Sequence, residues 1–260
     1  MSRGDLTEAE WRILKGLLPI EPENRSRGRR PEQNRSIING ILWRLRCGAP
    51  WRDVPPNYRS WDTIYRRFRR WSEAGVWETV AVTLAEIMAD SGHYSIDSTT
   101  IRAHVSAAGG KGGPHRRALG RSRGGFTSKL HYLADALGRP LAFLLTGGEA
   151  ADCKAYNALI GLPERKPDAL LADKGYDADA IRADLAERQI EAVIPGRSNR
   201  RVKIEHDRTL YKQRNRIERM FGHLKINRAI ATRYDQLANS FLGMVHLATA
   251  RYWLKLVHAA

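Results

Sequence analysis

Cysteine is scarce in this sequence, with only Cys47 and Cys153 among its 260 residues. Two isolated cysteines provide neither a disulfide framework nor a zinc site, and they fit a reducing cytoplasm. Long apolar runs are missing as well: acidic residues follow soon after Met1, and the apolar stretch 241–257 is interrupted by His246, Arg251 and Lys255. A membrane span needs about 20 mostly apolar residues. We therefore expect no signal peptide and no membrane span, and we interpret 241–257 as a buried helix.

Acidic residues are few relative to basic ones. Lys and Arg total 44 against 28 Asp and Glu, which gives a formal net charge of +16. Such an excess favours a polyanionic partner, although it says nothing about the fold. A basic arm at 21–32 and a glycine-rich loop at 109–125 hold many of the cations. A generic basic protein, such as a ribosomal one, would share this excess but would not need organised carboxylates.

Residues 1–80 predict a small helical domain. Thr7 and Glu10 form a capping-box pattern, apolar residues at helical spacing predict a second helix from residue 33, and a third starts near Ser60. A helix, a turn and a basic helix are typical of a helix-turn-helix module. The alternative is an ordinary three-helix unit with a solvated basic face. We expect the third helix to contact DNA through four arginines: Arg66, Arg67, Arg69 and Arg70.

Residues 90–260 predict a separate α/β domain. Strands are expected at 94–97, twice within 126–145, at 169–172 and at 192–194; helices are expected near 153–162, 179–188 and 207–227. One strand, then two, then alternating helices and strands match the ribonuclease H-like arrangement, a mixed sheet flanked by helices with right-handed crossovers. The expected fold class is therefore α/β, with an N-terminal all-α, helix-turn-helix-like domain.

Three carboxylates fall where this fold would bring chain segments together. Asp97 is expected to end the first strand, Asp173 ends a later strand, and Glu218 lies on the last long helix. Carboxylates suit hard divalent cations, and two Mg²⁺ ions about 3.5–4 Å apart serve phosphodiester chemistry. We expect all three residues to be catalytic and to bind metal, with Asp97 bridging the two ions.

The helix that carries Glu218 also groups three other polar side chains. At roughly 100° per residue, they share the Glu218 face within about one sixth of the circumference. These residues are Tyr211, Arg214 and Lys225.

Each acidic residue also has a simpler explanation. Aspartates at strand ends often form turns or cap helices, and a helical glutamate is usually solvated. Asp177 is the main rival of Asp173, and we interpret it as the N-terminal cap of the following helix; Asp135 and Asp152 are interpreted as turn residues. The joint order of the three acidic residues and their elements favours the catalytic interpretation.

At these positions the sequence resembles bacterial insertion-sequence transposases of the Asp-Asp-Glu class. The branch is the one whose helix carries Tyr, Arg, Glu and Lys at the spacing of Tyr211, Arg214, Glu218 and Lys225. Residues 96–99 resemble its first-aspartate block, residues 173–176 its second, and residues 48–55 part of its N-terminal domain. The likeness covers most of the chain.

The resemblance implies a function. It implies that Asp97, Asp173 and Glu218 bind catalytic Mg²⁺, or Mn²⁺ as a substitute, and that Tyr211, Arg214 and Lys225 contact terminal DNA. We expect a cytoplasmic, nucleoid-associated enzyme that acts as a homodimer on terminal inverted repeats and target DNA. It would hydrolyse a phosphodiester and then transfer the strand. The alternatives are a ribonuclease H-fold endonuclease or resolvase without strand transfer, and a non-catalytic DNA-binding regulator.

Overall fold

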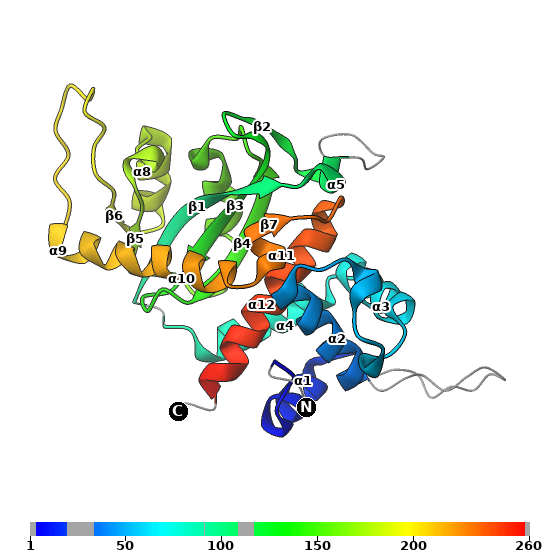
Figure 1. The fold of residues 1–260 in the computed structure, drawn as a ribbon. Helices are drawn as coiled ribbons and strands as arrows, with labels where there is room; N and C mark the ends of the chain where they lie inside the picture. The colour runs from blue at the N-terminus through cyan, green and yellow to red at the C-terminus, as the bar shows by residue number, and fades with distance from the viewer. Residues whose placement is uncertain (1–3, 20–33, 91, 109–116, 258–260) are drawn as a thin grey trace.

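The computed structural model describes residues 4–19, 34–90, 92–108 and 117–257. A mixed sheet occupies one end of the molecule and a group of helices the other, with the C-terminal helix α12 (Ala238–Val257) packed among those helices (Figure 1). The basic arm at 21–32 and residues 109–116 of the glycine-rich loop lie outside the described residues.

The elements follow one another much as the sequence predicts. The helical end comprises α1 (Glu8–Leu17), α2 (Asn34–Cys47), the 3₁₀ turns η1 (Trp51–Asp53) and η2 (Pro56–Tyr58), α3 (Trp61–Glu73) and α4 (Val76–Met88). The strands are β1 (His93–Ala103), β2 (Gly120–Ser122), β3 (Gly125–Ala134), β4 (Pro140–Gly147), β5 (Ala169–Leu171), β6 (Glu191–Val193) and β7 (Thr232–Arg233). The remaining elements are α5 (Val105–Ala108), η3 (Asp152–Ala155), α7 (Tyr156–Ile160), η4 (Lys174–Tyr176), α8 (Asp179–Glu187), α9 (Arg208–Tyr211), η5 (Lys212–Arg214), α10 (Asn215–Lys225) and α11 (Arg228–Ala231).

Strand β1 forms the middle of the sheet. It pairs antiparallel with β3 and parallel with β5, in the order β2-β3-β1-β5-β6, while β4 pairs with β3 and β7 with β1. This mixed sheet flanked by helices confirms the expected fold class. One detail was wrong: Asp97 lies inside β1 and does not end it, because residues 95–102 all pair with β3. Thr99, Thr100 and Ile101, which are β-branched, favour this extension.

Two apolar layers cover the two faces of the sheet. Leu130, Tyr132 and Ile101 join a core that includes α10 and α12, whereas Tyr94 and Ile96 pack on the other side with α7 and α8. Side chains alternate along a strand, so the odd-numbered residues of β1, Asp97 among them, face α10.

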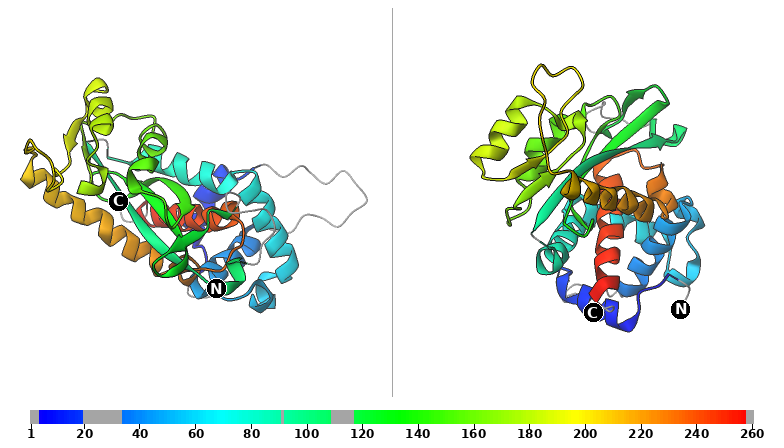
Figure 2. Two further views of the ribbon diagram at one scale, coloured as in Figure 1. Left: turned by 90° about the horizontal axis from the view of Figure 1, so that it is seen from above. Right: turned by 90° about the vertical axis from the view of Figure 1, so that its left-hand side faces the viewer.

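The helices before the sheet share their core with the last helix. α12 packs along α3 and α4, as Figures 1 and 2 show, and Phe68, Trp77, Phe241 and Trp253 belong to one buried cluster. This confirms the buried helix expected at 241–257. No helix of the described part of the chain is both long and apolar enough to cross a membrane. The boundary near residue 80 falls inside α4, and the division into 1–80 and 90–260 stays a prediction.

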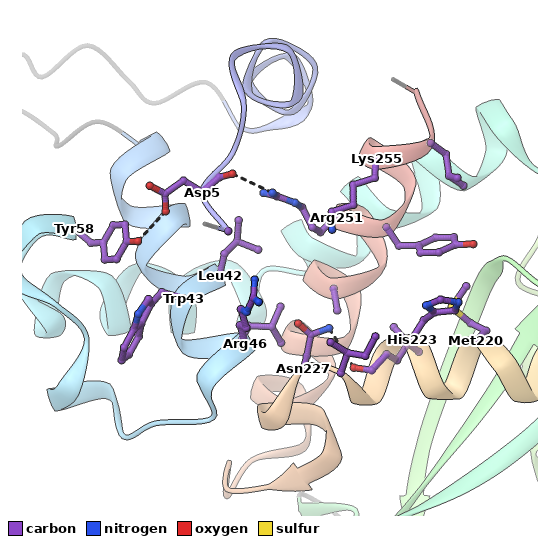
Figure 3. Close-up of a pocket in the computed structure, with 17 residues that line it drawn as sticks. Asp5, Leu42, Trp43, Arg46, Tyr58, Met220, His223, Asn227, Arg251 and Lys255 are labelled. Carbon is purple, nitrogen blue, oxygen red and sulfur yellow. Dashed lines mark hydrogen bonds between the residues drawn. The ribbon is translucent and has the colours of Figure 1, made fainter. Parts of the chain in front are cut away.

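The connection between α2 and α3 is longer than in a helix-turn-helix module. It spans residues 48–60 and contains η1 and η2, whereas such a module has a turn of about 3–4 residues. The N-terminal segment braces this region, as Figure 3 shows. The Asp5 carboxylate accepts a hydrogen bond from the Tyr58 hydroxyl at 2.8 Å, and the Asp5 carbonyl accepts one from Arg251 at 3.0 Å. The structure thus confirms that this region is helical, but the connection between α2 and α3 differs from that of a helix-turn-helix module.

Candidate active site

The two aspartates occupy matching positions on neighbouring strands. Ser95 is level with Leu171 in the parallel β1–β5 ladder, and Asp97 and Asp173 each lie two residues further on. Both therefore face the same side of the sheet, on strands about 4.8 Å apart. Asp173 follows β5 directly and caps η4, where its Oδ1 accepts the Gly175 amide hydrogen at 2.8 Å.

Glu218 approaches the aspartates from a helix. The segments α9, η5 and α10 follow one another across the sheet, as Figure 1 shows. Ile217, Phe221 and Leu224 are buried in the core beneath α10. The neighbouring face of the helix is left at the border with solvent, and the Glu218 side chain is 59% exposed there.

Arg214 joins two of the three carboxylates. Its Nη2 donates to Asp97 Oδ2 at 2.8 Å and its Nη1 donates to Glu218 Oε1 at 3.2 Å. Burial raises the pKa of Asp97, while Arg214 and the Ser98 amide oppose the rise and the charges of Asp173 and Glu218 add to it. Asp97 is thus a desolvated carboxylate whose charge a nearby cation stabilises.

The three acidic side chains are of the kind that binds divalent cations, but they do not converge on one point. Among the described residues, no three His, Cys, Asp or Glu side chains converge closely enough to hold a metal ion. The donors nevertheless consist of carboxylate oxygens on one side of the sheet, and a positive group already lies between Asp97 and Glu218. Hard cations prefer such oxygen ligands. The side-chain types therefore suit a divalent cation, while Arg214 occupies the space between two of the carboxylates.

Lys225 and Tyr211 border the carboxylates at opposite ends of the helical segment. Lys225 Nζ donates to Thr99 Oγ1 at 2.7 Å, and burial lowers the pKa of Lys225. Thr99 lies two residues after Asp97, on the same face of β1. Tyr211 packs with Leu210 against β5 and β6, its ring 5.3 Å from that of His206. The single helix expected at 207–227 is thus divided into α9, η5 and α10, which carry the four residues from β5 and β6 to β1.

Three of the α3 arginines are accessible. Arg66 is 79% exposed and pairs with Asp62 at 3.0 Å, Arg69 pairs with Glu73, and Arg70 is exposed. Pairs between exposed charges one helical turn apart are weak, so they leave these cations available to other anions.

Arg67 departs from this expectation. Its side chain is 8% exposed, stacks over the Trp71 ring at 5.1 Å and donates to Asn34 on α2. Arg67 lies at the edge of the apolar face of α3, and its side chain therefore contributes to the packing of α2 against α3. Contact between Arg67 and DNA stays a prediction, and this inward position does not favour it.

Asp177 is buried, but not as a helix cap. Its side chain accepts hydrogen bonds from Arg182 at 2.9 Å, from Arg200 at 2.7 Å and from the Arg197 amide at 2.7 Å. The N-cap position of α8 is Ala178, which provides no side-chain hydrogen bond. Although burial alone would raise it, these hydrogen bonds hold the pKa of Asp177 well below its ordinary value. Asp177 thus anchors the arginine-rich loop behind η4.

Asp135 is a turn residue, as interpreted from the sequence, whereas Asp152 also contacts side chains of β1 and β3. Asp135 accepts the amide hydrogens of residues 137 and 139 and pairs with Arg139 at 2.6 Å. Asp152 accepts from Ser98 Oγ at 2.6 Å and pairs with Lys129 at 3.1 Å, on the face of β1 opposite to Asp97. The sequence indicates this arrangement only in that Ser98 directly follows Asp97, which places the two side chains on opposite faces of β1.

Two family models match the chain. A model described as a putative transposase of the IS4/5 family matches residues 6–81, and one described as a transposase DDE domain matches residues 89–253. The chain belongs to the DDE transposases. A putative transposase for insertion sequence element IS6501 from Brucella ovis is 40% identical over 131 residues, which are 50% of this chain and 99% of that protein.

Further relatives agree with the family assignment. A putative transposase for insertion sequence element IS402 from Burkholderia cepacia is 34% identical over 122 residues, 43% of this chain and 56% of that protein. Among solved structures, the piggyBac transposase synaptic complex with hairpin DNA covers 96% of this chain and 70% of that chain with a TM-score of 0.55 and 11% identity. That likeness shows the fold. This transposase is therefore an insertion-sequence enzyme with a ribonuclease H-like sheet.

Proposed function

We propose that this transposase binds the terminal inverted repeats of an insertion sequence, frees a 3′ hydroxyl by hydrolysis and joins it to target DNA. Asp97, Asp173 and Glu218 would hold two Mg²⁺ ions, with Mn²⁺ as a substitute. Two copies, one at each terminus, would form the active homodimer. The observation that carries the proposal is the matched placement of Asp97 within β1 and Asp173 just after the parallel strand β5, with Glu218 facing them across Arg214.

The reaction consists of two displacements at phosphorus. In the first, a water oxygen forms a bond to the scissile phosphorus while the bond to the 3′ oxygen breaks, and that oxygen takes up a proton. In the second, the 3′ hydroxyl loses its proton and forms a bond to a target phosphorus, while the bond from that phosphorus to another 3′ oxygen breaks and this oxygen takes up a proton. Bound Mg²⁺ would neutralise phosphate charge and activate the attacking oxygen. The desolvated setting of Asp97 strengthens its attraction for any such cation.

Cationic side chains and Tyr211 would position the DNA on either side of the carboxylates. Lys225 and Tyr211 border the site along α10 and α9, and Arg214 would contact a phosphate once it leaves Asp97. The accessible arginines of α3 are Arg66, Arg69 and Arg70, and in this proposal residues 1–80 read the repeat while residues 90–260 carry the chemistry. The net charge of +16 supports extensive phosphate contact.

The test uses the full-length protein and a labelled duplex that carries the end of its own element. With Mg²⁺, we expect a nick that leaves a 3′ hydroxyl at the element's end, followed by joining to a second DNA; chelation by EDTA should abolish both. Nicking without joining would favour the resolvase-like alternative. Specific binding without nicking, in either Mg²⁺ or Mn²⁺, would favour the regulator.

A further inference from the structure

A hollow of about 760 Å³ lies where the ends of β1 and β7 approach the N-terminal helices. Figure 1 shows its surroundings, with α5 and β7 on one side and α2 and α3 on the other. Pockets for small organic molecules measure about 300–1,000 Å³, so this volume admits a nucleotide. Asp97, Asp173 and Glu218 are not among the residues that line it.

Aromatic rings face the hollow from both sides. Trp61 and Tyr65 project from α3, and His104 and Tyr234 form a pair with ring centroids 4.9 Å apart at the ends of β1 and β7. Tyr234 is 36% exposed although it is a large aromatic residue. Unpaired bases stack on such ring faces, whereas bases inside a duplex present only their edges.

Positive charge accompanies the rings. The Arg52 guanidinium lies 5.5 Å from the Trp61 ring centre and is exposed, while Arg69 lies 6.0 Å from that of Tyr65. The acidic member of the lining, Asp235, is already paired with the buried Arg44 at 3.1 Å. The hollow therefore presents rings and a net positive charge, which suits a base together with its phosphate.

Strand β1 also leads from the candidate active site to the hollow. Asp97 lies within β1, and His104 directly follows that strand. Seven residues at about 3.3 Å each span roughly 23 Å. This distance equals about seven base pairs at 3.4 Å. Lys225, bonded to Thr99, lies between the two points.

We infer that this hollow binds one unpaired nucleotide of DNA, its base stacked on Trp61 and Tyr234 and its phosphate near Arg52. The identification of the strand as part of the element's terminal or target DNA rests on the proposed function. Stacking itself does not depend on cleavage, so it is measured without metal.

The test is the binding of a short oligothymidylate with one 2-aminopurine to the full-length protein in metal-free buffer. Anisotropy of a terminal dye gives affinity, and 2-aminopurine fluorescence reports stacking. Trp61→Ala and Tyr234→Ala should each weaken binding about tenfold and relieve the quenching. Trp61→Phe and Tyr234→Phe should retain most of both. The matched control is Phe126→Ala, because Phe126 is 44% exposed and stacks with Arg121 at 5.1 Å but lies outside the hollow.

Unchanged affinity and quenching in Trp61→Ala and Tyr234→Ala would overturn the inference. So would equal losses in Phe126→Ala, or losses in the phenylalanine variants that match those in the alanine variants. Thermal unfolding of each variant shows whether it is folded, and the exposed Tyr234 provides a substitution that leaves the core intact. Failure of the proposed function would be seen separately, as wild-type protein that does not cut its element's end in Mg²⁺.

Discussion

At the scale of single residues, Arg214 bears on both proposed properties of the site, the contact with DNA and the binding of metal. The spacing predicts that it shares a helical face with Tyr211, Glu218 and Lys225, and it does lie one turn before Glu218, with which it pairs. Its contact with Asp97 could not be predicted, because Asp97 is 117 residues away in sequence and meets Arg214 only through the packing of this helical segment on β1. The guanidinium holds two carboxylates that a metal ion would need.

Arg214→Ala should raise the affinity of the DNA-free protein for Mn²⁺ by about fivefold to tenfold. The guanidinium then no longer competes for Asp97 and Glu218, and removing an ion pair of this kind is worth about 1 kcal/mol. Calorimetric titration with Mn²⁺ provides the measurement. Arg216→Ala is the control, because Arg216 lies two residues further on, at the start of α10, but donates to the Ala136 carbonyl at 2.6 Å. Equal affinities of wild type and Arg214→Ala would show that the two cations do not compete.

At the scale of elements, helix α3 carries arginines of two kinds: Arg67 packs inside the protein, whereas Arg70 is exposed. Apolar periodicity was sufficient to predict the helix, and Ile64, Phe68 and Trp71 are buried as expected. The same pattern could not separate Arg67 from Arg70, because an arginine at the border of an apolar stripe can either snorkel to solvent or stack on a ring. The Trp71 ring, one turn away, decides between these outcomes.

Arg67→Ala and Arg70→Ala should therefore differ in kind. Arg67→Ala loses a stacked, buried side chain and should lower the free energy of unfolding by about 2 kcal/mol. Arg70→Ala should leave unfolding unchanged but weaken duplex binding and reduce the salt dependence by about one phosphate contact. Urea unfolding and salt-dependent anisotropy measure the two effects. An unfolding loss in Arg70→Ala, or none in Arg67→Ala, would contradict the assignment.

Other elements show where prediction from sequence stops. The order of strands and helices from β1 to α10 follows from the hydrophobic periodicity and the turn residues. The fold and the choice of the three carboxylates could therefore be predicted from the sequence. The full length of β1 depends on its β3 partner, and the role of Asp177 depends on arginines from a loop 20 and 23 residues later. Such long-range pairings leave no local pattern in the sequence.

At the scale of the whole molecule, the sheet and the N-terminal helices meet through α12. His246 of α12 is buried there, its ring 5.8 Å from that of Phe143 on β4. Burial lowers the pKa of His246 to about 4. In the unfolded chain an imidazole titrates near 6.5. Between these values the unfolded chain binds more protons, so stability falls as the pH drops from about 6.5 to 4.

His246→Leu should flatten this pH dependence. Leucine keeps the apolar packing and does not titrate, so the variant should lose about 1 kcal/mol less per pH unit than wild type between pH 6 and 4.5. His131, whose pKa burial also lowers to about 4, continues to contribute. Urea unfolding at a series of pH values gives the slopes. Identical slopes would show that His246 is not desolvated at this junction.

The central claim is that Asp97, Asp173 and Glu218 form one catalytic set. The most direct measurement is Mg²⁺-dependent nicking of the element's end by Asp97→Asn, Asp173→Asn and Glu218→Gln, beside the exposed control Glu191→Gln on β6. Each of the three should lower the rate by at least about a thousandfold, because an anionic ligand is lost at nearly constant shape, while metal-free DNA binding stays within about twofold. The control should cut like wild type. Wild-type cleavage by any one of the three variants would remove that residue from the site and contradict the account.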